Sequence, residues 1–176
     1  MGNKEGEEDL RKNEPVTYLS GREIRLAHKA PVVFICLIDA AGNPIPDPCE
    51  KKLDTNKPPA TVDKVLICTE EQFILYSIPQ LKHHSKFKLT ADEGLRARKI
   101  ALVPFSSKLD KNTSEYFIVC LSNYGDIEVF SLSDFEQKLK TALTKKEDIQ
   151  AISSLVLTCS AEGFYLHSPS EFRRFS

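Results

Sequence analysis

The stretch that decides the fold is residues 65–77, VLICTEEQFILYS, in which two apolar runs flank a short polar turn. The same arrangement returns in residues 117–131, FIVCLSNYGDIEVFS, and in residues 155–168, LVLTCSAEGFYLHS. An apolar run, a tight polar turn and a second apolar run are typical of a β-hairpin. The sequence therefore contains one hairpin written three times, and repetition of this kind indicates a repeat architecture.

A second shared pattern follows each hairpin. A Ser stands three residues before a side chain that can reach back to the backbone of that Ser, which is the capping-box arrangement that begins a helical turn. The three copies are Ser77-Ile78-Pro79-Gln80, Ser131-Leu132-Ser133-Asp134 and Ser168-Pro169-Ser170-Glu171. An apolar residue follows each copy in register, namely Leu81, Phe135 and Phe172. We therefore expect a short helical turn after every hairpin.

Single strands are expected in the intervals between the hairpins. The continuous apolar run of residues 32–38 predicts a strand buried on both faces. Further strands are expected at residues 86–90, 99–105 and 149–156, whereas residues 138–143 fit either a strand or a helix. The copies recur at roughly 40–50 residues, which is the length of a propeller blade.

The predicted fold class is therefore all-β. We expect a partial WD40-like β-propeller of about two to three antiparallel four-stranded blades over residues 22–176. A single β-sandwich is the alternative, and the repeat argues against it. So few blades cannot close a ring and would leave blade faces uncovered. We therefore expect that the chain is a fragment of a longer protein or that it packs against other chains.

Two segments look irregular. Residues 1–21 are charged and lack apolar periodicity, so we predict a disordered leader there. Residues 41–59 contain five prolines and few apolar side chains. They predict a long loop, and long loops on rigid scaffolds often bind partners.

Composition narrows the class of protein. The chain has 176 residues, 41% of them hydrophobic, and a formal net charge of -1. A nucleic-acid binder would show a basic excess, and none is present. The longest apolar stretch, residues 30–38, is too short to span a bilayer, and no secretory signal is visible. The five cysteines form no C-x-x-C pair, which favours free thiols in a reduced, cytoplasmic protein.

No catalytic arrangement is found. The sequence lacks a Gly-rich phosphate loop, a G-x-S-x-G motif and an H-E-x-x-H motif. The adjacent His83 and His84 would point to opposite faces of a strand, and a metal site needs three or four converging ligands, so we expect them in a polar loop. We predict no enzyme activity, no cofactor, no metal and no small-molecule substrate.

Basic residues provide the candidate partner or lipid contacts. They are Lys86, Lys88, Arg96, Arg98 and Lys99. If they lie on one rim, they could bind an acidic partner or anionic lipid at about 1 kcal/mol per charge. The alternative is a solvated strand edge on which Lys blunts unwanted pairing.

The C-terminus holds a possible modification site. Arg173-Arg174-Phe175-Ser176 has the form of a basophilic kinase site. Ser176 is therefore the candidate phosphosite, because phosphorylation would give it negative charge.

Several segments in order resemble the lethal giant larvae family, whose tomosyn relatives share a double-propeller plan. They are residues 22–33 (REIRLAHKAPVV), 70–73 (EEQF), 88–94 (KLTADEG), 96–99 (RARK), 121–126 (LSNYGD), 146–149 (KEDI) and 168–172 (SPSEF). The resemblance covers residues 22–176 and implies the last blades of the second propeller. Residues 1–21 lie outside it.

The resemblance also implies a function. Family members are non-catalytic scaffolds in the cytoplasm, at the cell cortex and peripherally on the plasma membrane. They regulate epithelial polarity with atypical protein kinase C and the Par complex, and they act in exocytosis that depends on syntaxin-type SNAREs and with non-muscle myosin II of the cytoskeleton. The family's basic, Ser-rich kinase target has no counterpart in this chain. The alternative is a purely structural blade module or truncated fragment without a partner surface of its own.

Overall fold

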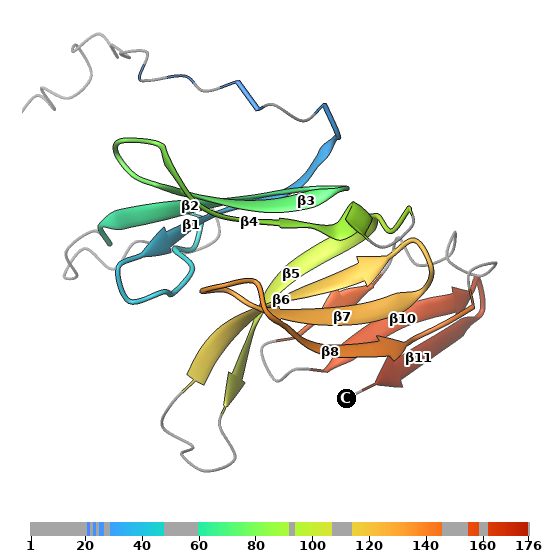
Figure 1. Cartoon of the computed structure of the whole chain (residues 1–176). Coiled ribbons are helices and arrows are strands. Elements are labelled where there is room, and N and C mark those ends of the chain that lie inside the picture. The colour runs from blue at the N-terminus through green and yellow to red at the C-terminus, as the bar shows by residue number, and fades with distance from the viewer. Residues whose placement is uncertain are drawn as a thin grey trace, which may run out of the picture.

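Three antiparallel sheets stack face to face in a computed structural model of the chain (Figure 1). The structure describes residues 21, 23, 25–26, 29–47, 60–91, 94–106, 114–145, 155–158 and 162–175. Within these ranges there is no α-helix, and the one helical element is the 3-10 turn η2 (Leu89–Ala91). The all-β prediction is confirmed, and the sheets are those expected of propeller blades.

Each sheet follows the chain as a meander. Sheet A holds β1 (Val32–Asp39), β2 (Val62–Thr69), β3 (Gln72–Ser77) and β4 (Lys82–Lys88). Sheet B holds β5 (Ala97–Ser106), β6 (Ser114–Ser122), β7 (Asp126–Ser131) and β8 (Gln137–Ala142). Sheet C has three described strands, β9 (Val156–Leu157), β10 (Gly163–Ser168) and β11 (Glu171–Phe175). The repeated hairpins are therefore β2–β3, β6–β7 and β9–β10.

A hydroxyl group closes the turn of every hairpin. The three equivalent side chains are Thr69, Ser122 and Thr158, and each ends the first strand of its hairpin or directly follows it. Their oxygens accept backbone N–H groups of the turn: Gln72 at 3.1 Å, Asp126 at 3.2 Å and Glu162 at 3.2 Å. A short side chain that bonds to nearby backbone favours a turn over continued strand, which explains why the strands reverse at these points.

The expected helical turns after the hairpins are wrong. The chain instead makes tight β-turns into a further strand, and Leu81 (φ 53°) and Phe135 (φ 60°) hold the left-handed conformation there. The Ser131 hydroxyl does serve the turn, because it accepts the Glu136 N–H at 3.2 Å. A helical turn needs consecutive right-handed residues, and the left-handed residue reverses the chain so that the outer strand can pair with the hairpin.

The boundaries of the outer strands also differ from expectation. β4 begins at Lys82, so His83 and His84 lie in a strand and not in a loop. The segment that fitted either a helix or a strand is strand β8. Both segments are strands because β4 pairs with β3 and β8 pairs with β7. Such pairing between segments cannot be read from a local sequence pattern.

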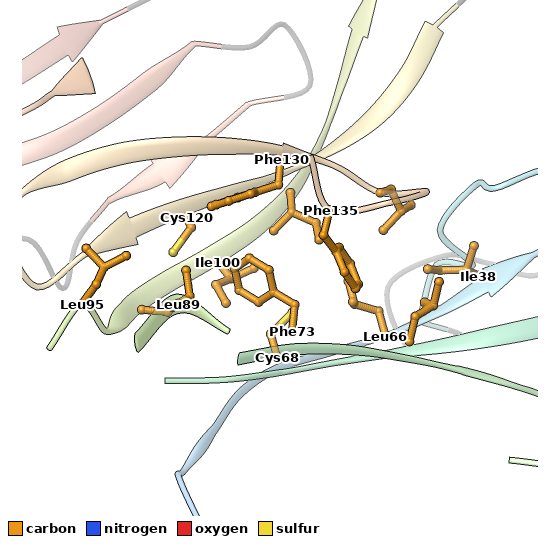
Figure 2. Close-up of a cluster of buried hydrophobic side chains, with 14 residues drawn as sticks. Ile38, Leu66, Cys68, Phe73, Leu89, Leu95, Ile100, Cys120, Phe130 and Phe135 are labelled. Atoms are coloured by element: carbon orange, nitrogen blue, oxygen red, sulfur yellow. The ribbon is translucent and has the colours of Figure 1, made fainter. Parts of the chain in front are cut away.

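Sheets A and B enclose the larger core (Figure 2). Phe73 of sheet A is fully buried, and its ring meets that of Phe130 edge-on at 5.3 Å between centroids. Phe87 and Phe135 lie 6.1 and 6.0 Å from the same ring. Aromatic rings at such separations attract each other in addition to burying apolar area. This cluster fixes sheet A on sheet B.

Sheets B and C enclose the second core. Val119 and Val129 point from sheet B toward sheet C, where Leu155 and Tyr165 are buried against them. Because alternate residues of a strand point to opposite faces, β6 and β7 supply both cores. This explains why the β6 run of residues 117–121 is apolar at every position rather than alternating.

Candidate functional site

The basic candidates lie around the seam between sheets A and B. The Ala97 N–H donates to the Glu70 carbonyl at 2.7 Å, and the Leu89 N–H donates to the Glu71 carbonyl at 2.9 Å. These bonds tie the start of β5 and the end of β4 to the β2–β3 turn. Lys88 and Arg96 therefore lie beside this turn, Arg98 and Lys99 lie at the start of β5, and Lys86 lies two residues before Lys88 on β4.

Arg96 is engaged within the chain. Its guanidinium lies 3.6 Å from Glu70 Oε2 and 3.3 Å from Glu71 Oε1. The Asn123 side chain accepts the Arg96 N–H at 2.8 Å and donates to the Gly94 carbonyl at 3.1 Å. Arg96 and Asn123 thus join the turns of the two sheets. The sequence analysis missed Asn123, for which the only signal was its place in the second hairpin turn.

Lys86 differs from its equivalents in the other sheets. Lys86, Lys140 and Arg173 pair with the residue three before the Ser that ends each hairpin. Lys140 lies 3.2 Å from Glu128 Oε1, and Arg173 lies 3.1 Å from Glu171 Oε1. Lys86 lies opposite Ile74, and no described carboxylate pairs with it.

Three further basic residues, like Lys86, form no ion pair within the described ranges. Within the described ranges, no carboxylate forms an ion pair with Lys88, Arg98 or Lys99. Together with Lys86 they make what we call the open basic group: Lys86, Lys88, Arg98 and Lys99. No ion pair among the described residues neutralises the positive charge of this group.

Glu128 is a buried carboxylate that the sequence analysis did not predict. Its exposed fraction is 1%, and it points toward sheet A. Oε2 accepts a hydrogen bond from Gln137 Nε2 at 2.9 Å, and Oε1 meets the Lys140 ammonium as an ion pair. A buried charge requires such compensation. The group stabilises β8 on β7.

Replacing Lys140 with Met is expected to lower the free energy of unfolding by about 2 kcal/mol. Loss of one partner of a buried pair costs roughly 3–5 kcal/mol, and the partial exposure of Lys140 reduces that value. Denaturant unfolding would measure the change. The control is Lys138→Met, since Lys138 pairs with Glu136 in solvent and should change stability by less than about 0.5 kcal/mol. Equal losses from the two variants would contradict the role given to Glu128.

The described cysteines are free thiols with raised pKa values. Cys36, Cys68 and Cys120 are free, as predicted. Burial raises the pKa of Cys68 and Cys120 far above the usual range, and it also raises the pKa of Cys36. A thiol is the poorly nucleophilic form of cysteine. Cys49 and Cys159 lie outside the described residues.

Metal sites, membrane-spanning helices and three predicted segments remain to be compared with the structure. The described residues contain no group of three or more His, Cys, Asp or Glu side chains suited to a metal ion. No described helix is long and apolar enough to cross a membrane. Ser176, residues 1–20 of the predicted leader (residues 1–21) and residues 48–59 of the predicted loop lie outside the described ranges.

The start of the Pro-rich loop is described, and Asp39 organises it. The Asp39 carboxylate accepts the N–H groups of Asn43 at 2.8 Å and Ala41 at 2.9 Å. These bonds stabilise the ionised form, with Asn43 contributing most, and hold the pKa of Asp39 below its usual value. The loop therefore leaves β1 through a fixed turn.

The two ends of the stack carry exposed apolar side chains. On the face of sheet A that points away from sheet B, Ile35 is 60% exposed and Leu37 is 40% exposed. On the face of sheet C that points away from sheet B, Phe172 is 64% and Val156 is 57% exposed. Large exposed apolar side chains gathered on one face mark an interaction surface.

Known proteins match this chain over nearly its whole length, although no family model matches it. The chain is 42% identical over 170 residues to Lethal(2) giant larvae protein homolog 1 of Mus musculus, covering 96% of the chain and 16% of that protein. It is 39% identical over 170 residues to LLGL scribble cell polarity complex component 2 of Homo sapiens, covering 96% of the chain and 17% of that protein. It is 33% identical over 192 residues to Lethal(2) giant larvae protein of Drosophila melanogaster, covering 88% of the chain and 16% of that protein.

The chain thus spans about a sixth of the length of these relatives. The resemblance that the sequence motifs suggested is confirmed, and it extends across the three stacked sheets. The prediction that residues 1–21 lie outside it is wrong, because residues 22–176 make up only 88% of the chain and the matches cover 96%. The chain is a homologue of one segment of the lethal giant larvae proteins.

Proposed function

We propose that the chain is a non-catalytic scaffold segment of a lethal giant larvae-like regulator of cell polarity and SNARE-dependent exocytosis. Its similarity to a protein named as a component of the scribble cell polarity complex supports a role in binding other proteins. The observation that carries the proposal is the open basic group, for which the described residues provide none of the carboxylates that accompany Lys140 and Arg173.

The proposed partner surface therefore attracts an acidic protein. Lys and Arg side chains that form no ion pair steer an acidic protein toward them and set its orientation. A syntaxin-type SNARE is the first partner to test, and the atypical protein kinase C and Par complex and non-muscle myosin II follow from the family. We place the scaffold in the cytoplasm, at the cell cortex and peripherally on the plasma membrane.

Charge reversal tests this surface. The variant Arg98→Glu/Lys99→Glu should bind a soluble syntaxin-type SNARE at least about tenfold more weakly, since each basic charge near an anionic surface contributes about 1 kcal/mol. Isothermal titration at two salt concentrations would measure the affinity. Arg96 is left unchanged because its ion pairs with Glu70 and Glu71 join the sheets.

The control carries the same change in charge at the other end of the outer strands. Lys82→Glu/Lys138→Glu should bind as the unchanged chain does, and both variants should melt at the same temperature. If only vesicles containing phosphatidylserine distinguish the variants, the group binds lipid and the SNARE proposal is wrong. If neither ligand distinguishes them, the chain is the purely structural module that forms the alternative.

A further inference from the structure

Strand β4 is an edge strand of sheet A, and its charges differ in state from those of the outer strands of the other two sheets. Every basic residue of β8 and β11 lies beside a described carboxylate: Lys138 beside Glu136, Lys140 beside Glu128 and Asp126, Arg173 beside Glu171, and Arg174 beside Glu162. β4 reads KHHSKFK and contains no acidic residue. Among the described residues, no carboxylate forms an ion pair with Lys82, Lys86 or Lys88. β4 is therefore a cationic strand edge whose charge the described part of the chain does not offset.

The free edge of β4 stays accessible whatever packs on the outer face of sheet A. Sheet B shows this, because sheets A and C cover its two faces while all six residues of β8 remain exposed. The edge of an outer strand thus lies beside the contacts between sheets and not within them. Such an edge presents a row of backbone N–H and C=O groups that have no partner in the sheet, which is the template that an added strand requires.

The side chains of β4 determine what an added strand must carry. Lys86 and Lys88 are two residues apart, so they point to the same face of sheet A. Phe87 lies between them and points to the opposite face, where its ring stacks on that of Phe73 at 6.1 Å between centroids. A strand laid along β4 in either direction would therefore place two side chains beside the lysines and the intervening side chain beside Phe87.

We propose that β4 binds an extended peptide segment by strand addition, and that this segment carries two carboxylates two residues apart with an apolar residue between them. Carboxylates opposite Lys86 and Lys88 form cross-strand pairs of opposite charge, which stabilise a sheet, whereas like charges at these places destabilise it. The two lysines therefore disfavour basic strands, which is the usual role of charge on an edge, and select acidic ones. The inference rests on the proposed function, because both lysines belong to the open basic group that is proposed to bind an acidic partner.

Two short peptides of identical composition and charge test the register, by NMR titration of the whole chain at about 0.15 M ionic strength. A peptide with the core Glu-Val-Glu should bind and shift the amide resonances of β4. A peptide with the core Glu-Glu-Val directs its two carboxylates to opposite faces of the strand. It should bind about fivefold more weakly, as expected for the loss of one cross-strand pair of opposite charge.

N-methylation of the Glu-Val-Glu peptide at every second residue separates strand addition from attraction by charge. Alternate N–H groups of a strand point to the same neighbour, so one alternate set faces β4 and the other faces solvent. Of the two peptides methylated on one set or the other, one should lose binding and the other should bind as the unmethylated peptide does.

Charge reversal of the chain tests the two lysines. Lys86→Glu/Lys88→Glu should bind the Glu-Val-Glu peptide at least about tenfold more weakly, because two pairs of opposite charge become pairs of like charge. The same variant should gain binding to a Lys-Val-Lys peptide, which the unchanged chain should not bind. Lys82→Glu/Lys138→Glu is the control, since it carries the same change in charge outside the three-residue register. It should bind the Glu-Val-Glu peptide within about twofold of the unchanged chain, because salt screens charges more than about 8 Å apart.

Equal binding of the Glu-Val-Glu and Glu-Glu-Val peptides, or of the two N-methylated peptides, would show that charge alone attracts them. That result would overturn the inference and leave the proposed function standing. An unchanged chain that does not bind Glu-Val-Glu, or a charge-reversed chain that does not bind Lys-Val-Lys, would also overturn the inference. The proposed function is decided separately, by the titration of the SNARE with Arg98→Glu/Lys99→Glu.

Discussion

Replacing Phe73 with alanine is expected to lower the free energy of unfolding by about 4 kcal/mol. Truncating a buried Phe costs roughly 3–5 kcal/mol, because apolar burial is lost and a cavity remains. Phe73 is fully buried and lies within 6.1 Å of three other rings, those of Phe87, Phe130 and Phe135. Its loss weakens the seam between sheets A and B, so sheet A should separate at lower denaturant concentration.

Denaturant unfolding followed by far-ultraviolet circular dichroism would measure this loss. Phe172→Ala is the matched control, since the Phe172 side chain is 64% exposed. That change should stay within about 0.5 kcal/mol, as surface substitutions usually do. Comparable losses at the two positions would mean that sheets A and B do not share a core.

Gly125→Ala is expected to lower the free energy of unfolding by about 3 kcal/mol. Gly125 has φ +88°, where a side chain costs about 1–2 kcal/mol, and an added Cβ would stand 2.4 Å from the Thr144 carbonyl oxygen. That oxygen belongs to the backbone, so relief requires the chain after β8 to move. The Leu143 N–H bond to the Gly125 carbonyl at 2.9 Å would then weaken, at about 1 kcal/mol.

Gly42 separates the two parts of this effect. It has φ +86°, but an added Cβ would meet no atom within 4 Å. Gly42→Ala should therefore cost only about 1 kcal/mol, the backbone part alone. Thermal and denaturant unfolding of both variants gives the comparison. An equal cost at the two glycines would show that the segment after β8 does not pack against the β6–β7 turn.

The repeat made most of the fold predictable from the sequence. Apolar runs such as residues 117–121 and 32–38 give strands whatever their surroundings. The prediction that residues 32–38 are buried on both faces is wrong, because Ile35 is 60% exposed and Leu37 is 40% exposed on the face of sheet A that points away from sheet B. The turns after the hairpins were mispredicted because Ser131 and Asp134 form local bonds that serve a β-turn as well as a helix start. The left-handed conformation of Phe135 depends on packing between sheets, which a local pattern does not contain.

The site was predictable only in part. The sequence identified the basic residues, but their pairing depends on contacts between distant segments. Arg96 meets Glu70 and Glu71 across the seam, and only the stacking of sheet B on sheet A brings them together. Among the described residues, Lys86 has no carboxylate partner, because Ile74 occupies the place that Glu128 holds in sheet B. All three outer strands are basic in sequence, so the sequence alone does not distinguish Lys86 from Lys140 and Arg173. The distinction requires the cross-strand register, which shows the residue opposite each of them.

The most direct test of the scaffold proposal is rescue of polarity in mouse epithelial cells that lack Lethal(2) giant larvae protein homolog 1. The cells would receive that protein with its matching segment replaced by this chain, either unchanged or with Arg98→Glu/Lys99→Glu. The account predicts that the unchanged chimaera restores apical and basal markers to their separate domains, and that the charge-reversed chimaera accumulates equally but fails to do so. Equal rescue by both chimaeras, or an unchanged chimaera that accumulates without rescue, would contradict it.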